Sequence, residues 1–306
     1  MATKQPKSRL EKSILDVESW ATDNWPPNEW LEQYVSGEID RPGLAAIDLY
    51  KHGMLLCSKA LLDAKRGQIG GALERMACGF RRRVVADGIS IQGLKGTARN
   101  ATSSLDSLTD LMLGAIALGQ PDAAQALYLT VVDGLAGGYG VRNGNNPPIG
   151  TTLRYAAFGL TILSNWLEKP LDLDKYALPR DPAWGPLVSM WRVPNPEKLL
   201  PALIAACDLH VARIALTERE ADSGDFEFDT PLLAVHPTEI LAVLRLRDLL
   251  GLPNPAHIDH PLMQTPYAQI TCTPNILGTL GAQDDLLENF LDTVRQRDPQ
   301  VLPAGL

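Results

Sequence analysis

The chain has 306 residues, of which 45% are hydrophobic and 21% are charged, and its formal net charge is −8 at pH 7. These proportions are those of an ordinary globular protein, and the length is sufficient for one large core or two smaller ones. Residues 1–100 carry 15 Lys or Arg and 12 Asp or Glu, whereas residues 101–306 carry 13 and 24. Because an acidic protein repels nucleic acid and anionic lipid, the charge argues against both as partners and favours a basic partner.

Features of the termini and the cysteines predict the compartment. The first twelve residues are polar and lack the apolar segment of a secretory signal. Apolar stretches such as 199–209 are too short and too interrupted to cross a bilayer. The cysteines are widely separated, with no C-x-x-C pair, at Cys57, Cys78, Cys207 and Cys272. We therefore predict a cytoplasmic protein with reduced cysteines, and no motif indicates a cofactor.

Apolar residues at helical spacing dominate the first third of the chain. Helices are predicted over residues 8–21, 28–36, 42–65 and 70–86. Residues 88–100, G-I-S-I-Q-G-L-K-G-T-A-R-N, are predicted to form a loop with at most a short strand.

The clearest supersecondary unit covers residues 102–134. Ser103 or Ser104 can cap its first helix, and Pro121 stands at the first position of the return helix, 123–132. The short link between the helices favours an antiparallel αα-hairpin. Small residues are expected to let the two helices of this hairpin approach closely, and they are Gly114, Ala115, Ala117, Ala123, Ala124 and Ala126.

The second half continues as helices separated by irregular segments. Helices are predicted over residues 151–168, 194–220, 237–250 and 284–296. No useful β-alternation and no fixed repeat of the kind that marks a regular solenoid is present. The sequence therefore predicts an all-α fold, an irregular bundle of antiparallel helical hairpins with a solenoid-like arrangement as a variant. We expect one domain, 1–306, with the Gly-rich residues 137–150 as the place for a seam.

Histidines offer the best candidate for a metal site. His257, Asp259 and His260 could supply two imidazoles and a carboxylate. The flanking prolines and the lack of an H-E-x-x-H motif argue against it. A second histidine segment, H-P-T-E, predicts a helix start with His236 as cap, Pro237 at the first helical position and Glu239 near the helix N-terminus.

Other catalytic patterns fail on spacing. The Gly-rich residues 137–150 lack the order of a phosphate-binding loop, and no G-x-S-x-G segment occurs. Asp106 and Asp110 lie one turn apart, as a catalytic carboxylate pair could. They also suit the first turns of a helix, where negative charge is stabilised, and we interpret them in that way.

The most unusual stretch is E-R-E-A-D-S-G-D-F-E-F-D-T-P, residues 218–231. Its spacing does not match a calcium loop, and acids at the end of a helix do not stabilise that helix. One interpretation is a solvated loop whose Phe226 and Phe228 pack on the core. The other is a surface that attracts a basic protein through its acids and anchors it through an aromatic side chain. The predicted partner-binding residues are Glu220, Asp222, Asp225, Phe226, Glu227, Phe228 and Asp229.

Two segments resemble a known group of proteins. The hairpin L-M-L-G-A-I-A-L-G-Q-P-D-A-A-Q-A-L and the run H-P-T-E-I-L-A-V-L-R-L-R-D-L-L-G-L-P-N-P-A-H-I-D-H-P-L-M-Q-T-P cover about one sixth of the chain. Both look like the all-α immunity proteins of bacterial polymorphic-toxin and contact-dependent competition systems. The resemblance implies a cytoplasmic protein that binds a cognate toxin and blocks it without catalysis.

Three hypotheses follow. The first is a toxin-neutralising protein that uses residues 218–229 against a basic surface. The second is a helical enzyme, metal-dependent through His257, Asp259 and His260. The third is a helical adaptor with several protein partners.

Overall fold

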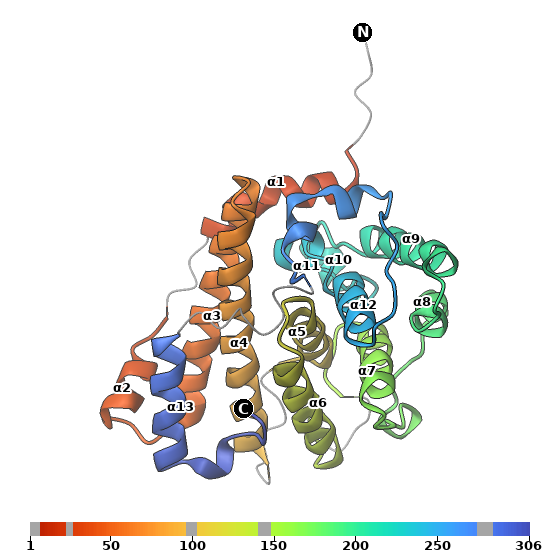
Figure 1. The fold of residues 1–306 in the computed structure, drawn as a ribbon. Helices are drawn as coiled ribbons and strands as arrows, with labels where there is room; N and C mark the ends of the chain where they lie inside the picture. Colours follow the sequence, from red (N-terminus) through yellow and green to blue (C-terminus); the bar gives the residue numbers. More distant parts are fainter. Residues whose placement is uncertain (1–6, 23–26, 96–102, 140–147, 274–283) are drawn as a thin grey trace.

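Helices provide the regular structure of the protein (Figure 1). The structure is a computed structural model that describes residues 7–22, 27–95, 103–139, 148–273 and 284–306. Over these residues there is no β-strand, and an isolated bridge joins Ile214 to Phe228. None of the helices in the described ranges combines the length and the apolar character needed to cross a membrane. The predicted all-α fold class is confirmed.

The helices of the first half are α1 (Arg9–Thr22), α2 (Trp30–Ser36), α3 (Pro42–Lys65), α4 (Ile69–Leu94), α5 (Leu105–Ala117) and α6 (Pro121–Ala136). Those of the second half are α7 (Arg154–Leu167), α8 (Gly185–Met190), α9 (Pro196–Ala212), α10 (Glu218–Ala221), α11 (Pro231–Val235), α12 (Thr238–Leu249) and α13 (Asp285–Arg297). The predicted hairpin is α5–α6, and Ser104 caps α5 by accepting the N–H of Ser107 over 3.2 Å.

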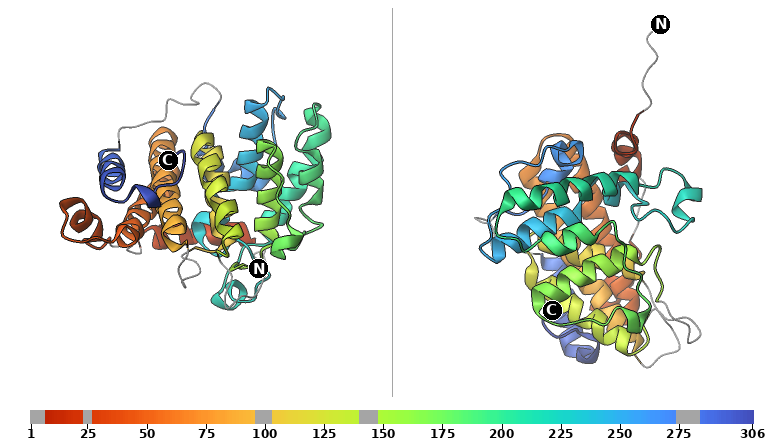
Figure 2. Two further views of the ribbon diagram at one scale, coloured as in Figure 1. Left: turned by 90° about the horizontal axis from the view of Figure 1, so that it is seen from below. Right: turned by 90° about the vertical axis from the view of Figure 1, so that its right-hand side faces the viewer.

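Antiparallel hairpins stand side by side in the molecule (Figures 1 and 2). The long helices α3 and α4 form one hairpin, and α5–α6 packs beside α4. Helices α7, α8, α9 and α12 lie beyond the α5–α6 hairpin, whereas α2 and α13 pack on the outer side of α3. Helix α1 crosses the end of α3 and reaches α11. The result is the irregular helical bundle that the sequence predicts.

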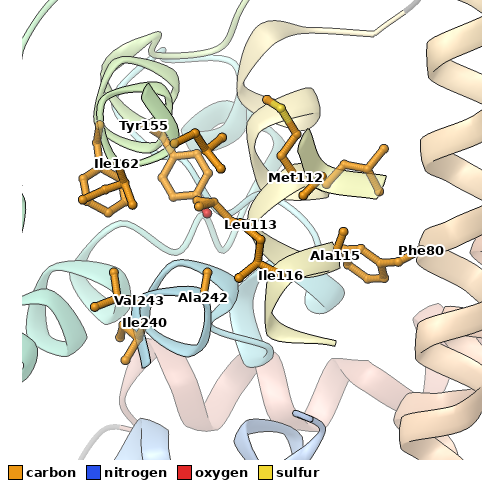
Figure 3. Packing of buried hydrophobic residues seen from close by; sticks show 14 of the residues in the cluster. Phe80, Met112, Leu113, Ala115, Ile116, Tyr155, Ile162, Ile240, Ala242 and Val243 are labelled. Carbon is orange, nitrogen blue, oxygen red and sulfur yellow. The ribbon is translucent and has the colours of Figure 1, made fainter. Parts of the chain in front are cut away.

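Helix α5 is the centre of the larger hydrophobic cluster. Every residue of α5 except Ser107 is buried. Figure 3 shows Ile116 directed toward Ala242 of α12, and Ala115 beside Phe80 of α4. A second cluster joins α2 and α13 to parts of α3 and α4. Because α5 is enclosed on several sides, its polar side chains also lie inside the protein.

Glycine determines the approach of α4 to α5. A Cβ atom on Gly114 would lie only 2.0 Å from Cε1 of Phe80, so a larger residue would displace the ring. The sequence predicts that Gly114 allows α5 to approach α6 closely. This prediction is wrong, because Gly114 faces Phe80 of α4 instead. The close contact between α4 and α5 thus depends on the fit of Phe80 against Gly114, two residues that lie far apart in the sequence.

Helix α4 is longer than predicted. It continues to Leu94, through much of the predicted loop 88–100, of which residues 96–100 lie outside the described ranges. Gly88 does not break the helix, because residues near the C-terminus pack there: a Cβ atom on Gly88 would lie 2.8 Å from Cγ of Pro303. Residues 140–147 of the predicted seam, 137–150, also lie outside the described ranges.

Two predicted boundaries in the second half are wrong. Helix α9 ends at Ala212 rather than at residue 220, because the next residues turn back to pair with Phe228. Helix α12 begins at Thr238 with Pro237 as its N-cap, so His236 is not the cap. His236 is buried, and its Nε2 lies 2.9 Å from the carbonyl oxygen of Ile270.

Candidate functional site

Residues 213–231, here called the acidic loop, leave the end of α9 and return at the start of α11. The loop closes on itself: the N–H of Ala215 donates to the carbonyl of Phe228 over 2.9 Å, and the N–H of Phe228 donates to the carbonyl of Arg213 over 3.2 Å. Thr217 caps the short helix α10 between these two ends. The acidic stretch is therefore a folded excursion with an inner and an outer face.

The inner face belongs to the core. Phe228 is 2% exposed, and its ring stacks on His210 with 3.9 Å between centroids. Glu227 is 7% exposed, and its Oε1 accepts hydrogen bonds from Arg213 Nη1 over 2.6 Å and from Thr152 Oγ1 over 3.2 Å. Burial raises the pKa of Glu227 to about 7, although both hydrogen bonds oppose this rise. The prediction that Glu227 and Phe228 contact a partner does not fit this burial.

A clasp from α1 covers part of the loop. Arg9 donates to both carboxylate oxygens of Glu220 over 2.9 and 2.8 Å, and to the carbonyl of Ile214 over 2.8 Å. Its guanidinium also lies 4.8 Å from the ring centroid of Phe226, which is half-buried. The hydrogen bonds from Arg9 are the largest cause that lowers the pKa of Glu220 to about 2. Glu220 and Phe226 therefore bind a guanidinium of the protein itself.

The outer face carries the remaining acids of the loop. Glu218, Asp222, Asp225 and Asp229 are exposed. Asp225 lies 3.8 Å from a guanidinium nitrogen of Arg154, a separation too long for a hydrogen bond. The other three form no ion pair with any residue in the described part of the chain. The fold thus leaves four exposed acids on one loop, although partial burial raises the pKa of Asp229.

A pocket of about 230 Å³ opens between this loop and α1. Asp16, Glu218 and Asp229 are among the residues that line it, and no Lys, Arg or His is.

A buried pair of ionisable groups packs against the inner face of the loop, where His210 stacks on Phe228. His210 and Glu239 are fully buried, with 2.8 Å between Nδ1 and Oε1, and His210 Nε2 lies 3.0 Å from the carbonyl of Ala234. With Glu239 ionised, both of these partners accept, so both ring nitrogens donate and the imidazole carries a proton. Burial alone lowers the pKa of His210, but the Glu239 carboxylate and the Ala234 carbonyl outweigh it and raise the pKa. No local sequence pattern indicates this pair, because its members lie 29 residues apart.

Asp106 and Asp110 also act between helices. Asp106 accepts backbone N–H bonds from Thr151 over 2.7 Å and from Ala156 over 3.1 Å, which fixes the start of α7. Asp110 accepts a 2.6 Å hydrogen bond from Thr238 of α12. Burial raises the pKa of Asp110 to about 6. Their interpretation as charges that stabilise their own helix end is therefore incomplete, because both carboxylates join α5 to another segment.

The histidine segment does not bring its three predicted metal ligands together. His257 Nε2 is 3.9 Å from Asp259 Oδ1, and both side chains are largely exposed. His260 instead accepts the N–H of Leu262 at Nδ1 and lies 3.2 Å from Asp208 at Nε2. Across the described ranges, no group of three His, Cys, Asp or Glu side chains is arranged to hold a metal ion.

The geometry offers electrostatic attraction more clearly than it offers chemistry. Acids with strongly raised pKa values, such as Glu227 and Asp110, lie inside the protein, whereas the acidic loop carries four exposed acids. No protein-family model matches the chain, and no curated protein or solved structure matches it either. The fold and this loop therefore carry the functional argument.

Proposed function

We propose that the protein is an immunity-type protein, which binds a basic protein toxin through the outer face of the acidic loop and neutralises it without catalysis of its own. The observation that supports this most is the division of the loop's acids. Glu227 is bound to Arg213 inside the protein and Glu220 is bound to Arg9 of α1, whereas of the four outer acids only Asp225 lies near an arginine, 3.8 Å from Arg154, in the described part of the chain.

Folding accounts for few of the outer acids. Glu218 stands in the first turn of α10, where its charge is favourable, but like charges on one loop repel one another. Such a group is useful when it meets a complementary surface, because it speeds encounter and rejects partners of like charge. The net charge of −8 extends the same preference to longer range.

The resemblance of two segments to bacterial immunity proteins names the class of partner. A cytoplasmic location belongs to the proposal, and the free thiols of Cys57, Cys207 and Cys272 are compatible with a reducing compartment. The structure favours this function over a metal enzyme, because His260 is directed to Asp208 rather than to His257.

The test is a capture experiment with matched variants. The tagged full-length protein is incubated with lysate of its native cell at low and at high salt, and retained proteins are quantified by mass spectrometry. One variant neutralises the outer face through Glu218→Gln, Asp222→Asn, Asp225→Asn and Asp229→Asn. The control variant removes the same charge elsewhere on the surface through Glu74→Gln, Glu168→Gln, Asp285→Asn and Glu288→Gln.

We expect one stoichiometric basic protein that the wild type and the control variant retain and the outer-face variant loses. Addition of the purified wild type should also inhibit that protein's activity. Equal retention by all three proteins would show that the loop is not the binding surface. A retained protein whose activity is unaffected would contradict neutralisation.

A further inference from the structure

The acidic loop forms a binding site for one guanidinium, and Arg9 of α1 occupies it. Arg9 donates to both carboxylate oxygens of Glu220 over 2.9 and 2.8 Å and to the carbonyl of Ile214 over 2.8 Å. The ring of Phe226 lies against the same guanidinium, 4.8 Å from its central carbon. These three groups are here called the guanidinium site. They match the planar fork and the flat face of an arginine side chain.

The loop positions its own groups in this site. The carboxylate of Glu220 accepts the N–H of Leu216 over 2.7 Å, and the N–H of Glu220 donates to the hydroxyl of Thr217 over 3.2 Å. The N–H of Ala215, which follows the Ile214 carbonyl, donates to the carbonyl of Phe228. The acceptors therefore keep their places without the arginine, and a site organised in advance can bind another guanidinium at low cost.

The occupant comes from a distant segment and is held at its edge. Arg9 is the first residue of α1 and lies 211 residues before Glu220 in the sequence. Helix α1 is anchored in the core by Leu10 and Val17, so it does not depend on Arg9 for its position. The side chains of Arg9 and Glu220 are 31% and 27% exposed. Because solvent reaches this ion pair and screens it, another cation can compete for Glu220.

A second arginine would be drawn to the same loop. Asp222 and Asp225 are exposed on it, and their charge favours the approach of a basic protein. Any arginine that this protein presents to the guanidinium site has to compete with Arg9. Since Arg9 is part of the same chain, it competes at a high effective concentration and lowers the apparent affinity of the loop for arginine.

We propose that Arg9 is an intramolecular competitor, which fills the guanidinium site until an arginine side chain of the protein partner displaces it. The inference rests on the proposed function, because it names the residue type by which a basic partner is recognised. It adds that α1 regulates this recognition through an autoinhibitory contact.

The experiment is an NMR titration of the full-length wild type and of the variant Arg9→Met with Nα-acetyl-arginine amide. Methionine removes the guanidinium and keeps an unbranched apolar stem. We expect saturable shift changes at the backbone amides of residues 214–220 and 226 in Arg9→Met, with a dissociation constant on the order of 10 mM for so small a probe. The wild type should bind the probe at least about tenfold more weakly, because Arg9 competes with it.

Matched variants and ligands define the site. Adding Glu220→Gln to Arg9→Met should weaken binding of the probe at least about tenfold, whereas adding Glu74→Gln, at an exposed position of α4, should leave it unchanged. The neutral isostere Nα-acetyl-citrulline amide should cause no saturable change in any of these proteins. Arg9→Lys should bind the arginine probe with an affinity between those of the wild type and Arg9→Met, because an ammonium is a poorer competitor for a bidentate site.

The proposal is overturned if wild type and Arg9→Met bind the probe equally, if Arg9→Met does not bind it, or if citrulline binds as arginine does. Shift changes confined to other parts of the surface, or equal binding with and without Glu220→Gln, would also overturn it. The dispersion of the spectra checks folding. If Arg9→Met is unfolded, the comparison of Arg9→Lys with the wild type decides, and equal affinities would contradict competition by Arg9.

The capture experiment separates this inference from the proposed function. At low salt, Arg9→Met should retain more of the basic partner than the wild type does, because its guanidinium site is free. Retention that is equal or lower would overturn displacement by the partner, while loss of the partner by the outer-face variant would still support the binding function. If the probe binds as expected but no basic protein is retained, Arg9 is an exchangeable occupant of the site and the proposed function falls.

Discussion

Replacing Glu239 by Gln should destabilise the protein in a way that depends on pH. Glu239 and His210 are fully buried, and the imidazole donates to Glu239 and to the carbonyl of Ala234. The substitution keeps the size of the side chain and removes the counter-charge. His210 then lies in the core with a neutral amide, so burial favours its uncharged form.

The expected cost is about 3 kcal/mol of the free energy of unfolding at pH 6, the lower end of what breaking a buried ion pair costs. The lower end applies because the amide oxygen of Gln can still accept a hydrogen bond and because His210 can release its proton. The pKa of His210 in the wild type is raised above its ordinary value of 6.5. The contribution of this ionisation is therefore fully present below pH 6.5 and is lost as the pH rises through the raised pKa.

The assay is equilibrium unfolding in urea, followed by circular dichroism, over a series of pH values from about 5.5 to 9. The difference between wild type and E239Q should be largest at the acidic end and should shrink as the pH rises. Glu227 and Asp110 also titrate in this range, and because Glu239 and His210 both act on the pKa of Asp110, the difference includes a contribution from Asp110. A surface control is Asp208→Asn, which disturbs the contact of His260 with a mostly exposed carboxylate and should cost less than about 1 kcal/mol.

A difference that stays constant with pH would refute the reasoning. So would a cost below about 1 kcal/mol at pH 6, since a buried pair of charges cannot be broken so cheaply. Either result would mean that His210 is neutral in the folded protein.

Three further predictions concern packing and the acidic loop. G114A should cost about 1–3 kcal/mol by forcing the ring of Phe80 aside, and F80L should relieve most of this cost when both changes are measured by urea unfolding. Phe228→Ala should cost about 3–5 kcal/mol, whereas Phe226→Ala, at a half-buried position, should cost much less; comparable costs would contradict the inner and outer faces. R9A should increase amide hydrogen exchange in α1 and residues 214–220 while leaving α5 unchanged, and uniform exchange would contradict a local clasp.

Local sequence signals were sufficient where a helix begins and ends by its own chemistry. The bounds of α3 match the prediction, because Pro42 opens the helix and Gly67 follows its end. The α5–α6 hairpin was found for the same reason, from the serine cap and from Pro121. These signals lie within a few residues of the boundary that they determine.

Boundaries set by distant partners could not be predicted. Helix α9 ends early because Arg213 turns to bind Glu227, and α4 passes through Gly88 because Pro303 packs against it. In the acidic loop, the alternation of acid and aromatic residues suggests that Phe226 and Phe228 share one face. The structure separates them, because Arg9 from α1 binds beside Phe226 while Phe228 stacks on His210.

Each of the two interpretations of the acidic stretch therefore fits the burial of part of it. Phe228 and Glu227 pack into the protein as the solvated-loop interpretation expects, whereas Asp222 and Asp225 are exposed as a binding surface requires. The sequence alone could not separate these residues, because the division depends on α1 and α9. Sequence patterns indicated the segment, and tertiary contacts decided which of its side chains are accessible.

The most direct test of the account is the association rate of the captured partner with the wild type and with the outer-face variant at several salt concentrations. We predict that the wild-type rate falls at least about tenfold between roughly 0.05 and 0.5 M salt, and that the variant associates slowly with little dependence on salt. Equal rates with equal salt dependence for the two proteins would contradict the claim that the acidic loop attracts a basic partner.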